Sequence, residues 1–125
     1  MEERPGAMSY DEGLAERIRT AMASVVDRPV AEKKMFGGIA FMLDDKMCVG
    51  VVKEDLMVRV GPLRHESALK ERGARVMDFN HRPAVGFLFV GPEGYESEKD
   101  LTKWLGWSIE YVDSVPARPA KAKKK

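Results

Sequence analysis

The sequence predicts an α+β fold, a two-layer sandwich with one antiparallel sheet and helices on one of its faces, in the order α-β-β-β-α-β-β-α. Apolar residues recur at helical spacing near both ends of the chain. Between them lie short apolar runs separated by turns of about three residues, and such short loops join antiparallel strands because a parallel crossover needs a dozen residues or more. A parallel dinucleotide-binding fold is therefore disfavoured.

The first helix is expected to begin at Ser9, because Ser9 and Glu12 form a capping-box pattern. Pro29 ends it, since the residue before a proline avoids the helical region. The apolar positions expected on one face of this helix are Leu14, Ile18, Ala21 and Val25.

Strands are expected next at 35–43, 47–52 and 56–60, with turns at 44–46 and 53–55. Gly37 and Gly38 interrupt the first of these runs. The pair fits no phosphate-binding loop pattern, and a β-bulge or a close approach by another backbone explains it more simply.

The second half of the chain begins with the break at Gly61-Pro62. A short helix to about residue 72, a hairpin of strands 75–79 and 85–90, and a last helix starting at Ser97 are expected to follow. Pro116 ends the last helix. Its apolar stripe consists of Leu101, Trp104, Leu105, Ile109 and Val112.

Charge separates the body from the C-terminal end. Of 21 basic residues, five lie in 118–125, which leaves 16 against 20 acidic residues in 1–117, a net charge of −4. We expect one domain at 9–116 and a basic, disordered tail at 117–125. The tail lysines Lys121, Lys123, Lys124 and Lys125 suit either a solubility tail or a weak, salt-sensitive contact with nucleic acid.

Composition excludes several classes of protein. The 125 residues contain no apolar stretch long enough to span a membrane, and the N-terminus lacks the pattern of a secretory signal. A single cysteine, Cys48, excludes an internal disulfide framework and a cysteine-rich zinc site. We expect a soluble, cytoplasmic protein without membrane contact, cofactor or metal.

Few residues suggest catalysis. Cys48 lies within a strand and is expected to be a small buried hydrophobe. His65 and His81 could serve as bases, but no serine motif or spaced histidine pair accompanies them, so surface positions are expected. Arg59 is a charge in an apolar strand: it either faces outward or anchors an anion or acidic partner.

Aromatic residues on the last helix suggest a contact surface. Trp107 and Tyr111 follow Trp104 at i+3 and i+7 and widen the apolar arc beyond one sheet face. Aromatic side chains are favoured at protein interfaces. We expect a homodimer or a partner protein docked near this helix, with simple edge packing as the alternative.

Several segments resemble the N-terminal domain family of the TfoX/Sxy regulators of natural competence over about residues 10–115. The most specific is Lys34-Met35-Phe36-Gly37-Gly38, and the others are 55–60, 77–79 and the pair Leu101 and Trp104. The resemblance implies a two-layer α+β sandwich similar to type III secretion chaperones, and it supplies no catalytic residues. Full regulators carry a second, C-terminal helical domain, so the chain resembles the stand-alone form, for which the family implies no defined activity.

The leading hypothesis is a non-enzymatic domain that acts through protein contacts, with a regulatory role related to competence or transcription. One alternative is an enzyme or a small-ligand or anion-binding domain that uses Arg59, His65 or His81. Another is a nucleic-acid binder that works through its tail.

Overall fold

The computed structural model describes residues 10–35, 37–79 and 82–115. Within these ranges, six strands form a single antiparallel sheet in the order β1-β2-β3-β4-β6-β5. The strands are β1 (Ala31–Met35), β2 (Gly38–Leu43), β3 (Lys46–Val52), β4 (Asp55–Arg59), β5 (Ala74–Phe79) and β6 (Arg82–Val90). The helices are α1 (Glu12–Val25), α2 (His65–Leu69), the 3₁₀ turn η2 (Pro92–Gly94) and α3 (Glu98–Ser114).

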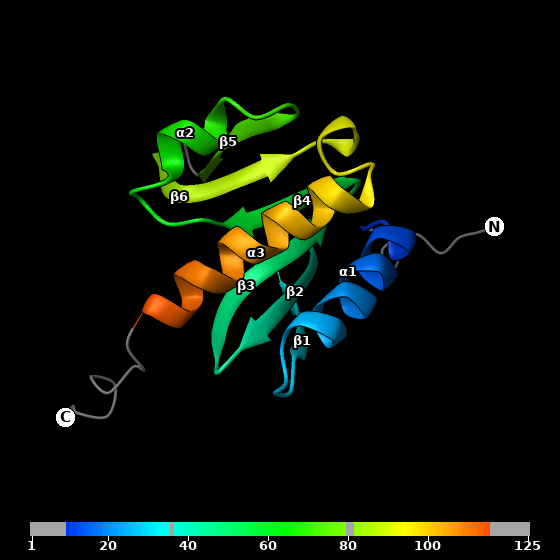
Figure 1. Ribbon diagram of the computed structural model, residues 1–125. Coiled ribbons are helices and arrows are strands. Elements are labelled where there is room, and N and C mark those ends of the chain that lie inside the picture. The colour runs from blue at the N-terminus through cyan, green and yellow to red at the C-terminus, as the bar shows by residue number, and fades with distance from the viewer. Residues whose placement is uncertain (1–9, 36, 80–81, 116–125) are drawn as a thin grey trace.

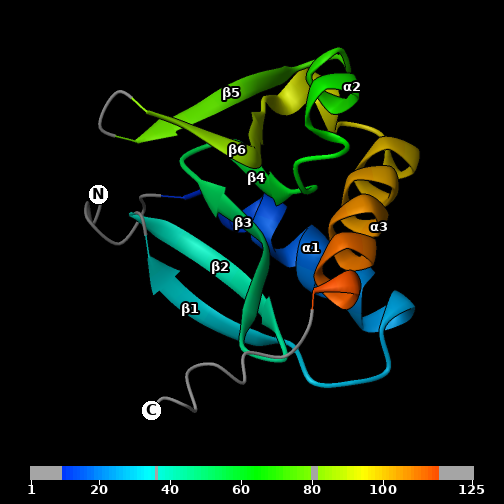
Figure 2. The same cartoon turned by 90° about the vertical axis from the view of Figure 1, so that its left-hand side faces the viewer.

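The helices lie on one side of the sheet (Figures 1 and 2). Helix α3 crosses β3 and β4, and α1 runs beside it, while α2 packs near β5 and β6. The core between the layers includes fully buried Ile18, Phe41, Val58 and Trp104. The predicted α+β class and the predicted placement of the helices are therefore confirmed.

Helix α1 begins later than its capping-box pattern predicts. Asp11 caps it, and its carboxylate accepts a hydrogen bond from the Leu14 N–H at 3.1 Å. Its buried face is centred on Leu14, Ile18 and Met22. Val25, predicted on that face, is 52% exposed, and Met22 is the last residue of α1 that is buried. The predicted cap, Ser9, lies outside the described residues.

The apolar run at 35–43 is not one strand. The chain reverses within it, since Met35 pairs with Gly38 and β1 returns antiparallel to β2. Strand β1 has the sequence Ala-Glu-Lys-Lys-Met and is mostly exposed at the sheet edge. Charged edge strands discourage pairing with other chains, and they lack the apolar alternation from which strands are predicted.

The last helix agrees closely with its prediction. The Ser97 hydroxyl accepts a hydrogen bond from the Asp100 N–H at 3.0 Å and caps the N-terminus of α3. At the other end the Lys46 ammonium, which is buried, donates to the Val115 carbonyl oxygen at 2.9 Å. A cation at that position satisfies an orphan carbonyl and complements the helix dipole. The predicted tail at 117–125 lies outside the described residues.

Candidate functional site

A glycine directs the chain away from the sheet after β4. The N–H groups of Val60 and Gly61 both donate to the Gly86 carbonyl oxygen, at 2.8 and 3.1 Å. Gly61 has a φ of +89°, and a Cβ at this position would lie 2.3 Å from the Tyr111 ring. Only glycine adopts this conformation easily and leaves room for that ring. Residues 60–64 consequently run alongside the C-terminal half of α3.

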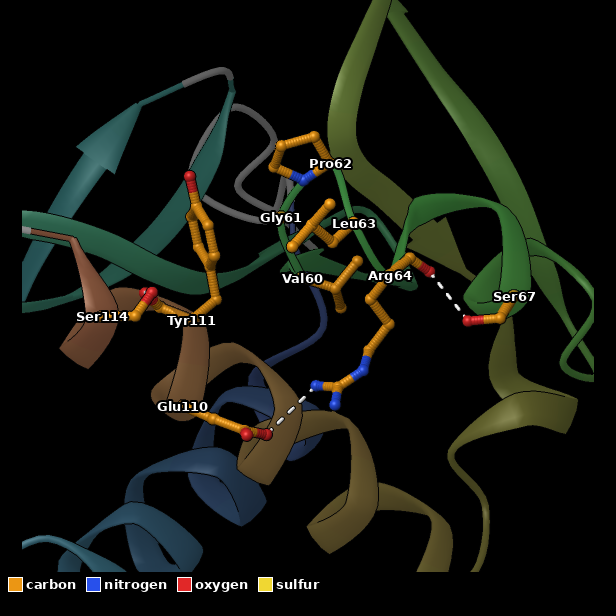
Figure 3. Close-up of a pocket in the computed structure, with 9 residues that line it drawn as sticks. All are labelled: Val60, Gly61, Pro62, Leu63, Arg64, Ser67, Glu110, Tyr111 and Ser114. Atoms are coloured by element: carbon orange, nitrogen blue, oxygen red, sulfur yellow. Dashed lines mark hydrogen bonds and ion pairs between the residues drawn. The ribbon is translucent and has the colours of Figure 1, made fainter.

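The space between this segment and α3 forms an open cleft of about 440 Å³. Tyr111 lies on one side, and Pro62 and Leu63 lie on the other (Figure 3). The side chain of Leu63 is fully exposed. The residues that line the cleft are Val60, Gly61, Pro62, Leu63, Arg64, Ser67, Glu110, Tyr111 and Ser114.

The charged side chains at the rim of the cleft are paired with each other. The Arg64 guanidinium donates to the Glu110 carboxylate at 3.2 Å (Figure 3). The Ser67 hydroxyl donates to the Arg64 carbonyl oxygen at 3.2 Å, which holds it in the local turn. Apolar walls inside a polar rim suit an apolar side chain of a partner rather than a bound ion.

Trp107 lies one turn before Tyr111 on α3 and is half-buried. Its ring meets Trp104 edge-on, with centroids 5.3 Å apart. Arg64 lies 5.0 Å from the Trp107 ring centroid, and the Lys103 ammonium lies 5.3 Å from it. These cation–π contacts and the packing on Trp104 give Trp107 a role in the fold. A contact with another protein at Trp107 stays a prediction.

Arg59 packs within its own chain. Its guanidinium lies 5.6 Å from the Phe87 ring centroid and 5.4 Å from that of Tyr111, and it donates to the Met47 carbonyl oxygen at 3.2 Å. The Arg59 side chain therefore supports Tyr111, but it does not itself line the cleft. Its predicted role as an anion anchor stays a prediction.

Among the described residues, His65 and Arg59 make separate hydrogen bonds and do not contact each other through one. The Nδ1 atom of His65 accepts a hydrogen bond from the Gly86 N–H at 2.9 Å and so ties α2 to β6. Like Arg59, His65 does not line the cleft. His81 lies outside the described residues.

Cys48 is fully buried in β3, as predicted. Burial raises the pKa of its thiol to about 12, so the thiolate that reacts as a nucleophile is absent at neutral pH. Over residues 10–35, 37–79 and 82–115, no group of three or more His, Cys, Asp or Glu side chains is placed to hold a metal ion.

The motif at Lys34, Met35, Gly37 and Gly38 forms the β1–β2 hairpin. Gly37 has a φ of +75°. A Cβ at Gly38 would lie 1.9 Å from the Val51 carbonyl oxygen on β3. The predicted close approach of another backbone is confirmed at Gly38, so the glycines serve the fold. Phe36 lies outside the described residues.

An antiparallel sheet backed by helices on one side, with an open, largely apolar cleft beside the last helix, defines a small α+β domain. Residues 21–111 match the family model of the TfoX N-terminal domain, and the chain therefore belongs to this family, as its motifs indicated. No curated protein and no solved structure matches the chain. None of the helices in the described ranges has the length and hydropathy to cross a membrane.

Sequence reasoning found Tyr111 but missed Leu63 and Glu110. The sequence feature that could have pointed to Leu63 is its position directly after the Gly61-Pro62 break, outside any helical or strand periodicity. That signal marks an unusual leucine, but only the fold shows that it lies across from α3.

Proposed function

We propose that this domain acts by binding a partner protein, and not by catalysis, at the cleft between Leu63 and Tyr111. The observation that carries the proposal is the fully exposed Leu63 at the mouth of a largely apolar cleft. Such a leucine contributes no burial to its own fold, and apolar surface gathered at a cleft is typical of an interaction site. The Arg64–Glu110 pair supplies the polar rim that surrounds an interface core.

The partner that fits is a protein that inserts an apolar side chain between Leu63 and Tyr111. Leucine and tyrosine walls offer area for burial, while the paired rim offers no uncompensated charge to recruit a phosphate or carboxylate. Membership in the TfoX N-terminal domain family supports a regulatory role in the cytoplasm, related to competence or transcription. No contact in the described residues favours anion binding at Arg59 or chemistry at His65.

The test substitutes Leu63 with aspartate. Because Leu63 is fully exposed, Leu63→Asp should leave the melting temperature unchanged while placing a charge where an apolar group must dock. Val85→Asp is the matched control, since Val85 is also an exposed apolar residue and does not line the cleft. Tagged wild-type protein and both variants would be used to retain partners from a cell lysate, quantified by mass spectrometry.

A specific partner should be retained by wild type and Val85→Asp and reduced about tenfold or more with Leu63→Asp, the usual effect at an interface hot spot. The proposal fails if Leu63→Asp, folded as well as wild type, retains the same proteins in the same amounts.

A further inference from the structure

Gly106 lies at the centre of α3, and no contact within its own chain explains why a glycine is needed there. It is exposed, it is not among the glycines with positive φ, and a Cβ built on it meets nothing within 4 Å. Glycine is the least favourable residue in a helix interior apart from proline. Its usual compensation is to let another backbone come close. In the described structure no segment does so at Gly106.

The outer ridge of α3 has an antisymmetric charge pattern about this glycine. Lys99 lies two turns before Gly106, and Asp113 lies two turns after it; both are exposed on the same side of the helix. Between them the ridge carries the uncharged side chain of Thr102 and the half-buried Ile109. One end of the ridge therefore carries the positive Lys99 and the other the negative Asp113, while the exposed Glu110, one turn before Asp113, is paired with Arg64.

An apolar groove runs beside the ridge, between α1 and α3. It has a volume of about 230 Å³, and the half-exposed Val25 forms its outer edge. Figure 1 shows α3 in front of the sheet with α1 alongside, and no described element covers its outer face. The residues that line the groove are Ala21, Val25, Thr102, Leu105, Gly106, Ile109 and Glu110.

We propose that a second copy of this chain packs its α3 antiparallel across this ridge, with the two Gly106 residues at the crossing point. A two-fold axis through the crossing places Lys99 of each chain opposite Asp113 of the other. A parallel arrangement would instead oppose like charges, which disfavours it. Glycine at the centre lets the two helices approach closely, and Val25 and Ile109 flank the contact.

The dimer surface and the proposed partner site share one lining residue, Glu110, and are otherwise made of different residues. The ridge at Lys99, Gly106 and Asp113 contributes no residue to the Leu63–Tyr111 cleft. Asp113 already accepts a hydrogen bond from Arg28 of its own chain through one carboxylate oxygen. The Asp113 side chain is still 48% exposed, so its carboxylate can accept a further hydrogen bond from Lys99 of the second copy. The inference therefore goes beyond the proposed function and can fail independently of it.

The first test uses charge reversal and mixing. Wild type should dimerise in sedimentation velocity as its concentration rises. Lys99→Glu and Asp113→Lys should each weaken the homodimer about tenfold, because each places two like-charged pairs across the axis. An equimolar mixture of the two folded variants should associate as a heterodimer, since every pair is then opposite in charge. A wild type that stays monomeric, or a mixture that associates no better than either variant alone, overturns the proposal.

The second test examines the geometry of the helix crossing and does not depend on Asp113. A cysteine introduced as Gly106→Cys lies on the axis and should form an intermolecular disulfide under mild oxidation. The native Cys48 is buried and does not compete. Thr102→Cys is the control, because Thr102 would face Glu110 of the second copy and not the second Thr102. This variant alone should therefore form no crosslink, but it should form one when it is mixed with Glu110→Cys. Equal crosslinking of Thr102→Cys and Gly106→Cys alone contradicts the two-fold crossing.

Discussion

Gly37 and Gly38, neighbours in the family motif, are required for different reasons. Gly37 turns the chain with φ +75° and has open space around its Cα. Gly38 has an ordinary backbone, but the Val51 carbonyl oxygen of β3 occupies the place that a side chain would take. The first glycine of the pair therefore lets the chain turn between β1 and β2, and the second lets β2 lie close to the backbone of β3.

The first prediction compares these two positions. Gly38→Val should lower the free energy of unfolding by about 3 kcal/mol, because its side chain must displace backbone. Gly37→Val should cost less, about 1–2 kcal/mol, from backbone strain alone. Urea denaturation measures both.

Gly106→Ala is the control for that comparison, measured in dilute protein. It meets no neighbour and should raise stability by up to about 1 kcal/mol. Unchanged stability in Gly38→Val would contradict the close backbone approach.

At the scale of elements, one ion pair connects α1 to the edge of the sheet. The Arg19 guanidinium donates to both carboxylate oxygens of Glu32 on β1, at 2.7 and 2.9 Å. These hydrogen bonds hold the pKa of the Glu32 carboxyl below its usual value, against the opposing effect of burial. The pair links α1 directly to β1.

The lowered pKa predicts a pH dependence. Above the unfolded-state pKa of Glu32 the folded state gains the full benefit of the ionised carboxylate, and the benefit is lost as pH falls through the lower folded-state pKa. Glu32→Gln should therefore reduce stability at neutral pH by about 0.5–1 kcal/mol and approach wild type as the pH falls through the lowered folded-state pKa of Glu32.

Urea unfolding across acidic pH checks this expectation. Glu66→Gln, which makes the same substitution at an exposed carboxylate on α2, is the control. A constant difference between Glu32→Gln and wild type from neutral to acidic pH would show that charge at Glu32 is not involved.

Elements with strong periodicity were predictable, and those made by tertiary contact were not. The stripe of α3 and its Ser97 cap could be derived from spacing alone. Strand β1 could not be predicted in this way. Its residues Glu32, Lys33 and Lys34 are exposed to solvent at the sheet edge, so they show no apolar alternation. The helix expected to reach residue 72 is the short α2, which ends at Leu69 and packs against β5 and β6.

At the scale of the whole molecule, the candidate site depends on contacts between distant parts of the sequence. The width of the aromatic arc on α3 predicted a protein contact at Tyr111, and the structure places Tyr111 in the wall of the cleft, where that contact stays a prediction. Leu63 could not be assigned to that surface, because its position follows from Gly61 and from the hydrogen bonds to Gly86 on β6. The α3 side of the molecule thus presents a cleft on one flank of the helix and an apolar groove on the other.

The central claim is that the Leu63–Tyr111 cleft binds a partner protein, and site-specific photo-crosslinking tests it most directly. A photoreactive amino acid would be introduced at Leu63, and separately at the exposed Val85, in the full chain inside cells. The account predicts a discrete adduct with another protein from position 63 and none from position 85. No adduct from position 63, the same adducts from both positions, or an adduct composed only of two copies of this chain would contradict it.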